Sequence, residues 1–300
     1  MEQLLQNLAW ETVKQIALIG FLLVPMFVGA WCLGLVKKRH KQRAVAPFTG
    51  QPLRSPGESL RLKIEELDEK STDEILMMVA LPCFAAAIFA TAFRDSSWQF
   101  IAVMFLITAL YVNWRTKRLR VLMQTMWNYR IGFDGERVVG EELNQLMLDG
   151  YRVFHDLPFE GFNIDHVVVG ASGVFALETK TKRKQTDTDG KKLEWRVKYD
   201  GKSLVFPLSG ADSRWLDQAG RNAQILGDWL SKAVAEEISV SPILVLPGWL
   251  IDRKARGTVN VLNEKEVRYS FPRTKDTLAP ALIQRIAHQL GEKCRLPSNE

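Results

Sequence analysis

The feature that most constrains this chain is an uncharged, largely apolar run from Ile16 to Val36. As a helix, this run is long enough to cross about 30 Å of hydrocarbon. Two further apolar runs, 75–93 and 98–114, are separated by a few residues, which forces an antiparallel helical hairpin. Trp98 and Trp114 suit the two interfaces of a bilayer. The sequence therefore predicts three transmembrane helices, at about 16–36, 75–93 and 98–114, within a membrane region 1–120.

The distribution of positive charge predicts the orientation of these helices. The basic clusters Lys37–Arg43 and Arg115–Arg120 should remain in the cytoplasm. The amino terminus then lies outside, and both the connector 37–74 and everything after Arg115 lie inside. A cleaved signal peptide is the alternative for the first run, but its positive charge follows the apolar run instead of preceding it. We expect a multi-pass protein of a bacterial-type inner (cytoplasmic) membrane, with the lipid bilayer as a partner.

The remaining residues, 121–300, have the pattern of a cytoplasmic α/β domain. Three cysteines are too few for a disulfide framework, and neither they nor the four scattered histidines have zinc-site spacing. A mixed β-sheet flanked by helices is the expected architecture. The expected elements are a helix 135–150, a strand 151–157, a hairpin 162–169 and 174–180, a second hairpin 194–207 turning at Asp200-Gly201, a helix 213–234, strands 242–246 and 258–262, and a helix 278–290.

The first hairpin, "NIDHVVVGASGVFALETK", carries the candidate chemistry. If residues 170–173 form the turn, Asp165 lies opposite Glu178, and Asn163 lies opposite Lys180. Opposed side chains share a face, with Cβ atoms about 5 Å apart. Two opposed carboxylates repel each other, and a divalent cation, Mg²⁺ or Mn²⁺, would relieve that repulsion. A register slip of one residue would turn one carboxylate away.

This patch predicts phosphodiester hydrolysis. Asp165 and Glu178 would hold a metal that polarises a phosphate oxygen and activates a bound water. Lys180 would orient or help to deprotonate that water, or stabilise charge in the transition state. His166 points to the opposite face by alternation and is interpreted as structural, whereas His155 and Asp156 lie at a strand end from which they can approach the site.

A basic stretch with interleaved aromatic residues follows the hairpin. Cations neutralise phosphates, and an aromatic ring can stack on an unpaired base. The alternative is an ordinary solvated hairpin with a buried Trp195. The predicted nucleic-acid contacts are Lys182, Arg183, Lys184, Lys191, Lys192, Trp195 and Arg196.

Three segments, "FDGERVVGEEL", "VFHDLPFEGFNIDHVVVGASGVFALETK" and "DQAGRNAQIL", resemble the nuclease-related domain (NERD) family. That family belongs to the PD-(D/E)xK nuclease-like superfamily, so the resemblance implies a restriction-endonuclease-like fold over about 130–262. It implies that Asp165, Glu178 and Lys180 are catalytic, with Glu136 completing the site and Gln218 lying near it. Ile164 stands where the motif has proline.

We therefore expect a membrane-anchored, metal-dependent nuclease acting on DNA, with RNA the less favoured substrate. The alternative is a catalytically inactive, membrane-tethered domain that binds nucleic acid or serves as a scaffold. A third interpretation makes the spans a sensor or transporter that the domain regulates, but the spans contain almost no ionisable residues.

Overall fold

A computed structural model describes residues 51–92, 98–184, 195–271 and 278–295. The chain divides into two compact units. Among the described residues, one unit holds Glu66–Thr125, and the other holds Gln51–Glu65 together with the chain from Met126 onward. The second unit contains all the candidate site residues that the structure describes.

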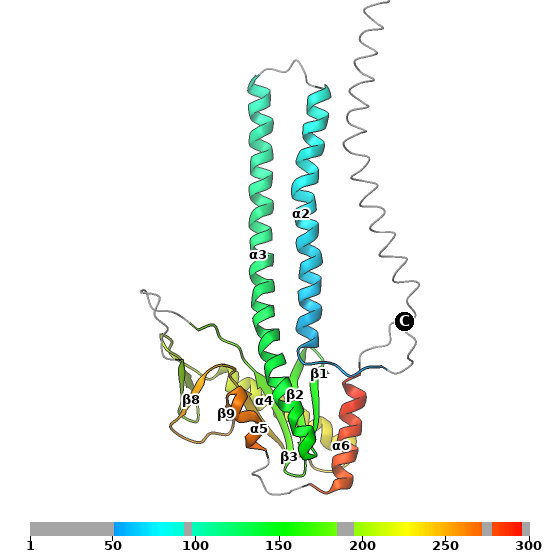
Figure 1. Cartoon of the computed structure of the whole chain (residues 1–300), viewed down its shortest axis with the longest axis vertical. Coiled ribbons are helices and arrows are strands. Elements are labelled where there is room, and N and C mark those ends of the chain that lie inside the picture. Colours follow the sequence, from blue (N-terminus) through cyan, green and yellow to red (C-terminus); the bar gives the residue numbers. More distant parts are fainter. Residues whose placement is uncertain (1–50, 93–97, 185–194, 272–277, 296–300) are drawn as a thin grey trace, which may run out of the picture. The chain divides into compact units, whose positions relative to one another are not determined.

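The first unit is a pair of helices. It consists of most of α2 (Glu58–Ala92) and the first part of α3 (Trp98–Asn144), which lie side by side in Figure 1. The Tyr111 hydroxyl donates to the Met77 carbonyl oxygen at 3.0 Å, and Arg115 pairs with Glu74 at 3.0 Å. The two helices of the predicted hairpin therefore pack against each other, although α2 begins well before and α3 ends well after the predicted limits.

No helix in the part of the chain that the structure describes has an apolar stretch long enough to cross a membrane. The predicted spans 75–93 and 98–114 are thus not supported. The apolar part of α2 begins only after charged turns that reach Glu74, and α3 continues from Trp114 into the basic segment that starts at Arg115. The first predicted span, 16–36, lies outside the described residues.

A five-stranded mixed sheet forms the centre of the second unit, with strand order β1-β2-β3-β7-β9. The first three strands are antiparallel, and β3, β7 and β9 are parallel. This arrangement confirms the expected mixed sheet. The strands are β1 (Arg152–Phe159), β2 (Phe162–Gly170), β3 (Gly173–Thr179), β7 (Val240–Val245) and β9 (Asn260–Leu262).

A second, smaller sheet accompanies the first, where the sequence suggested a single sheet. Its strand order is β6-β5-β4-β8, with β4 (Arg196–Tyr199), β5 (Leu204–Val205), β6 (Ala211–Asp212) and β8 (Leu250–Arg253). The predicted turn at Asp200-Gly201 joins β4 to β5. Gly201 has φ +90°, which favours glycine, and the Asp200 carboxylate accepts from the backbone N–H groups of the turn. The unpredicted strand β8 extends the sheet by pairing with β4 in parallel.

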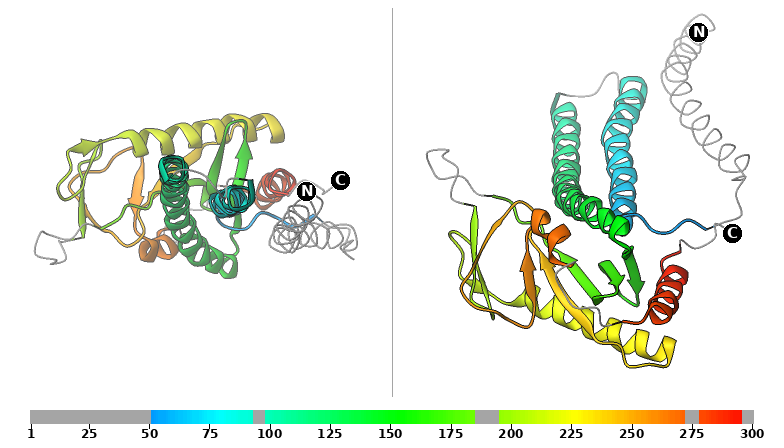
Figure 2. Two further views of the ribbon diagram at one scale, coloured as in Figure 1. Left: turned by 90° about the horizontal axis from the view of Figure 1, so that it is seen from above. Right: turned by 60° about the horizontal axis from the view of Figure 1, so that its bottom comes forward.

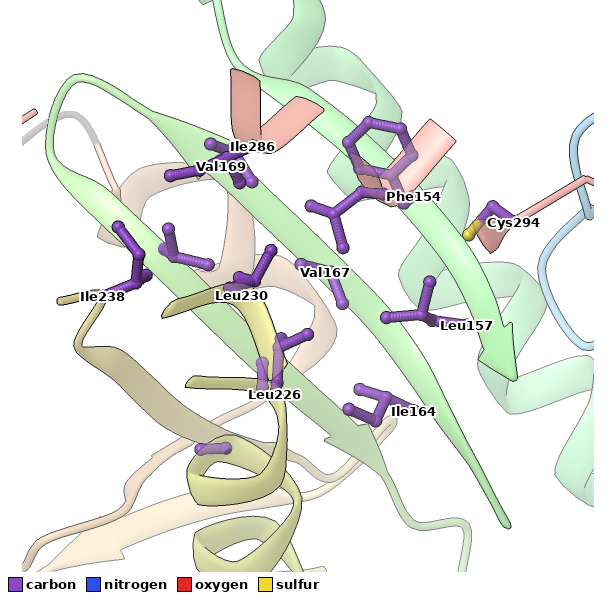
Figure 3. Packing of buried hydrophobic residues seen from close by; sticks show 14 of the residues in the cluster. Phe154, Leu157, Ile164, Val167, Val169, Leu226, Leu230, Ile238, Ile286 and Cys294 are labelled. Carbon is purple, nitrogen blue, oxygen red and sulfur yellow. The ribbon is translucent and has the colours of Figure 1, made fainter. Parts of the chain in front are cut away.

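Helices cover both faces of the larger sheet (Figure 2). On one face lie α4 (Arg214–Val234) and α6 (Pro280–Lys293), which contribute Leu226, Leu230 and Ile286 to a core that Figure 3 shows. On the other face lie the end of α3, the short helix η1 (Gln145–Asp149) and α5 (Glu264–Ser270). Val167 and Val169 belong to the first core and Val168 to the second, as strand alternation requires.

That alternation is interrupted at Asp165. Ile164 and Val167, three residues apart, both face the α4 side (Figure 3). The pairing of β1 with β2 skips Asp156 and Asp165, between His155↔His166 and Leu157↔Ile164. Asp156 has φ +51°, in the left-handed region that Asp tolerates better than most residues. The break lies at the candidate site and redirects the side chains around it.

Candidate active site

Glu178 is the centre of the candidate site. It lies near the end of β3, is 3 % exposed, and faces α4. One carboxylate oxygen, Oε1, accepts from Lys180 Nζ at 2.7 Å and from Gln218 Nε2 at 2.6 Å. The other, Oε2, accepts from Asn222 Nδ2 at 2.7 Å. The structure therefore brings together Glu178, Lys180 and Gln218, which the sequence assigned to one site.

All the paired residues of β2 and β3 have the predicted register. The pairs run from Gly170↔Gly173 to His166↔Leu177, and the same register puts Asp165 opposite Glu178. The ladder ends before that pair, and the Asp165 carboxylate instead accepts the backbone N–H of Thr179 at 2.7 Å. Asn163 pairs with Pro158 on the β1 edge of β2, whereas the β2–β3 pairs end at His166↔Leu177 and do not reach the predicted pair of Asn163 with Lys180.

Asp165 has an unusual electrostatic environment. Burial of the carboxyl group raises its pKa well above the ordinary value, and repulsion from Glu178 and Glu136 raises it further. The hydrogen bond from Thr179 opposes this shift without cancelling it. The repulsion acts among Asp165, Glu178 and Glu136, so the three acids share one electrostatic environment.

Glu136 approaches the site from α3. A Cβ atom added to Gly135 would lie 2.7 Å from Thr181 Oγ1, so the missing side chain lets α3 pass close to the chain that leaves β3. Glu136 is 8 % exposed, and its Oε2 atom has no hydrogen-bond partner in the described structure. Burial, followed by repulsion from Asp156 and Glu178, raises the pKa of Glu136 to about 8.

Lys180 remains a cation in this setting. Burial lowers the pKa of its ammonium group, but the attraction of Glu178 and of the other two site acids outweighs burial, so the pKa is raised. A protonated lysine donates hydrogen bonds and cannot accept a proton. Of the roles predicted for Lys180, the arrangement therefore favours orientation and charge stabilisation over deprotonation of water.

The acid cluster has the chemistry of a magnesium site. The carboxylates of Asp165 and Glu178 are hard oxygen ligands, and the unpartnered Oε2 of Glu136 is a third oxygen that lacks a donor. No group of three or more Asp, Glu, His or Cys side chains is arranged to hold a metal within the described ranges. A magnesium ion needs only one or two carboxylates beside its waters and a substrate phosphate, so the residues present fit Mg²⁺.

The two histidines near the site form a separate, buried pair. His155 Nδ1 and His166 Nδ1 are 2.9 Å apart, and His155 Nε2 lies 3.0 Å from Asn144 Oδ1. An amide oxygen only accepts, so His155 donates through Nε2, and His166 Nδ1 donates to His155. Both rings are neutral, because burial lowers both pKa values, that of His155 to about 4. The structural interpretation of His166 fits this pair.

Asp156 binds the segment that precedes α2 and the first turn of that helix. Its buried carboxylate accepts from Arg54 Nη1 at 2.6 Å, from the Ser59 backbone N–H at 3.0 Å, from Ser59 Oγ at 2.7 Å and from Asn163 Nδ2 at 2.9 Å. It thus fixes the first turn of α2 to the sheet, and it reaches Glu136 only through electrostatic repulsion.

The predicted nucleic-acid contacts are only partly available. Lys182 Nζ lies 4.0 Å from the centre of the Phe206 ring, and Lys184 Nζ lies 3.5 Å from the centre of the Trp195 ring. Trp195 also packs against the core of the smaller sheet, which favours its structural interpretation over base stacking. Arg183 and Arg196 are exposed, whereas Lys191 and Lys192 lie outside the described residues.

Asn222 is the site residue that the sequence analysis missed. It is 6 % exposed and donates to the one oxygen of Glu178 that Lys180 and Gln218 leave open. Its spacing from Gln218 was the available signal, because residues i and i+4 share a helix face.

Residues 131–247 match the family model described as the nuclease-related domain (NERD). The matched range includes Glu136 and the whole β2–β3 hairpin, which supply the three acids, and α4, which supplies the amide donors Gln218 and Asn222. Neither a curated protein nor a solved structure matches this chain. A nuclease-related domain implies interaction with nucleic acid.

Proposed function

We propose that the nuclease-related domain of this chain is a magnesium-dependent nuclease that hydrolyses phosphodiester bonds of DNA. The observation that carries the proposal is the cluster of Glu136, Asp165 and Glu178, held beside the Lys180 ammonium group. Burial and mutual repulsion make this cluster unfavourable unless it binds a proton or a cation in addition to Lys180. If this end of the sheet had only a structural role, three neighbouring acids would lower its stability.

Each residue has a role in this proposal. Asp165 and Glu178 would hold Mg²⁺, or Mn²⁺, which supplies polarisation of a phosphate oxygen and a lower pKa for a bound water. Gln218 and Asn222 fix both oxygens of Glu178, so that its orientation does not depend on the metal. Lys180, with its side chain 26 % exposed, can donate to a phosphate oxygen while it stays paired with Glu178.

The test is a cleavage assay of the full chain with plasmid and single-stranded DNA, with and without Mg²⁺. Glu178→Gln and Lys180→Met should each abolish cleavage, and Glu141→Gln, an exposed acid on the same helix as Glu136, should not. Calorimetry with Mg²⁺ alone gives a second readout, since Glu178→Gln should also lose metal binding. Cleavage that survives Glu178→Gln, or that proceeds equally in a chelator, would contradict the proposal.

A non-cleaving domain that binds nucleic acid is the competing function. It is favoured by one observation: both oxygens of Glu178 already accept hydrogen bonds from side chains of the protein. It predicts DNA binding by the wild type, Glu178→Gln and Lys180→Met alike, with no Mg²⁺-dependent cutting by any of them. The same assay with RNA in place of DNA tests whether the less favoured substrate is cleaved.

We also propose attachment to the inner membrane, with the nuclease-related domain in the cytoplasm. The support is the sequence of the run 16–36 with the basic cluster after it, together with the exposed apolar side chains Phe105, Leu106 and Val121 on α3. The full chain should remain in the membrane pellet after alkaline extraction, and a chain that lacks residues 1–36 should be extracted more readily. Equal extraction of both would refute a role for the first run.

A further inference from the structure

An open cavity of about 900 Å³ borders α4, and its lining does not include Gln218 or Asn222, the two α4 residues that contact Glu178. The turn between β4 and β5, the first two turns of α4 and the segment 255–259 form its walls. Three cations, Lys202, Arg221 and Arg256, line it, and all three are exposed. None of their charged groups has an ion-pair or hydrogen-bond partner in the part of the chain that the structure describes.

The two acids at the same cavity are directed elsewhere. The oxygens of Asp200 accept from the backbone N–H groups of Lys202 and Ser203 and from Ser203 Oγ, which ties this carboxylate to its own turn. Asp217 accepts from Ser213 Oγ at 3.0 Å. Both acids therefore have donors within their own segments, whereas the three cationic groups have no acceptor there and remain available to a ligand.

Three glycines lie in the wall of this cavity, and two of them, Gly201 and Gly257, let their backbone segments pack closely together, since a Cβ atom at Gly257 would lie 2.1 Å from the Gly201 carbonyl oxygen. Gly201, Gly220 and Gly257 all line it, and a Cβ atom added to Gly220 would meet no atom within 4 Å. A side chain at Gly220 would thus project into free space on the cavity side. Backbone without side chains next to unpaired cations is a suitable environment for a phosphate group, which needs close approach and positive charge.

We propose that this cavity binds phosphate groups of a nucleic-acid strand at a site separate from the acid cluster. Helix α4 connects the two sites, because Gln218 and Asn222 contact Glu178 while Asp217, Gly220 and Arg221 line the cavity. The inference rests on the proposed function for the identity of its ligand. Lys202, Arg221 and Arg256, which lie outside the predicted basic stretch 182–196, would then position the strand.

The test measures binding of the full chain to fluorescent single-stranded DNA in chelator, which prevents cleavage, over a series of salt concentrations. The triple variant Lys202→Gln, Arg221→Gln, Arg256→Gln should bind more weakly. The slope of log affinity against log salt, which is negative, should become shallower by about 0.7 for each phosphate that the variant no longer neutralises, or about 2 in total. Gly220→Gln keeps all three cations but fills the cavity, and it should also weaken binding.

A matched triple variant, Arg152→Gln, Lys232→Gln, Lys265→Gln, removes three cations elsewhere in the same unit and should change binding far less. Equal losses of affinity in the two triple variants, wild-type binding by the cavity variants, or no DNA binding at all would each overturn the inference. Competition with a free nucleoside triphosphate is a further test. If the triphosphate displaces DNA only from proteins with an intact cavity, the cavity is a nucleotide site and the inference is overturned. Binding that depends on the cavity, in a protein that never cleaves DNA, would refute the proposed nuclease but not this inference.

Discussion

The ion pair between Arg54 and Asp156 makes the sharpest stability prediction. The two side chains are 15 % and 1 % exposed, and their charged atoms are 2.6 Å apart. Replacing Arg54 by alanine would leave a buried carboxylate without its counter-charge, a type of change that destabilises proteins by about 3–5 kcal/mol. Three donors, from Ser59 and Asn163, would remain on Asp156, so we expect the lower end of this range, about 3 kcal/mol.

The assay is urea unfolding of the full chain, arranged as a double-mutant cycle. Asp156→Asn removes the charge but retains a residue type that tolerates the left-handed conformation at φ +51°. In that background, Arg54→Ala should destabilise by only about 1 kcal/mol, because no buried charge is left unpaired. The exposed pair of Arg137 with Glu141 serves as the control, with an expected loss of about 0.3–0.5 kcal/mol for Arg137→Ala. Equal effects of Arg54→Ala in both backgrounds would refute the reasoning.

Three further predictions concern the site and its surroundings. Asn222→Leu removes a buried donor to Glu178 and should weaken Mg²⁺ binding about 10- to 100-fold in calorimetry; unchanged affinity would contradict a positioning role. The pKa of His155 is lowered to about 4 in the folded protein, so its stabilising contribution is complete above pH 6.5 and decreases as the pH falls toward 4. The melting temperature should therefore be lower at pH 5 than at pH 7, with a smaller difference in His155→Gln. The pKa of Glu136 is raised to about 8, so the unfolded state, in which this carboxyl ionises near pH 4.5, is increasingly favoured from pH 4.5 to 8. In chelator, Glu136→Gln should raise the melting temperature at pH 8 more than at pH 5, and the opposite order would exclude this explanation.

The parts of the fold that the sequence predicted are those that short-range patterns determine. Gly170 and Gly173 bound a two-residue turn between apolar runs, and a turn of that length determines the register of the whole hairpin. Gly150 ends the helical segment before β1 with φ +86°, where most residues are strained. Helix α4 begins and ends within one residue of its predicted limits.

The missed parts depend on contacts between distant segments. The alternation pattern cannot reveal the break at Asp165, because the conformation of Asp156 follows from bonds to Arg54 and Ser59, about a hundred residues earlier. Similarly, β8 contains only four residues, and its place in the smaller sheet depends on parallel pairing with β4. The continuity of α3 through Gly132 and Gly135 also depends on tertiary contacts, since glycine by itself disfavours a helix interior.

The acid cluster shows how the two kinds of information combine. The hairpin alone predicts two carboxylates and an amine, which a solvated strand surface could equally present. The structure adds burial by α3 and α4, and burial determines the energetics: an exposed pair of acids is screened by water, whereas buried acids must bind a proton, a cation or a donor. Glu178 has donors on both oxygens, and Lys180 supplies one positive charge for three acids. Glu136 retains an oxygen without a donor, so at neutral pH the cluster is completed either by a proton on Glu136 or by a cation. These alternatives compete, so Mg²⁺ binding should release a proton near pH 7, and a buffer-dependent calorimetric enthalpy would detect that release.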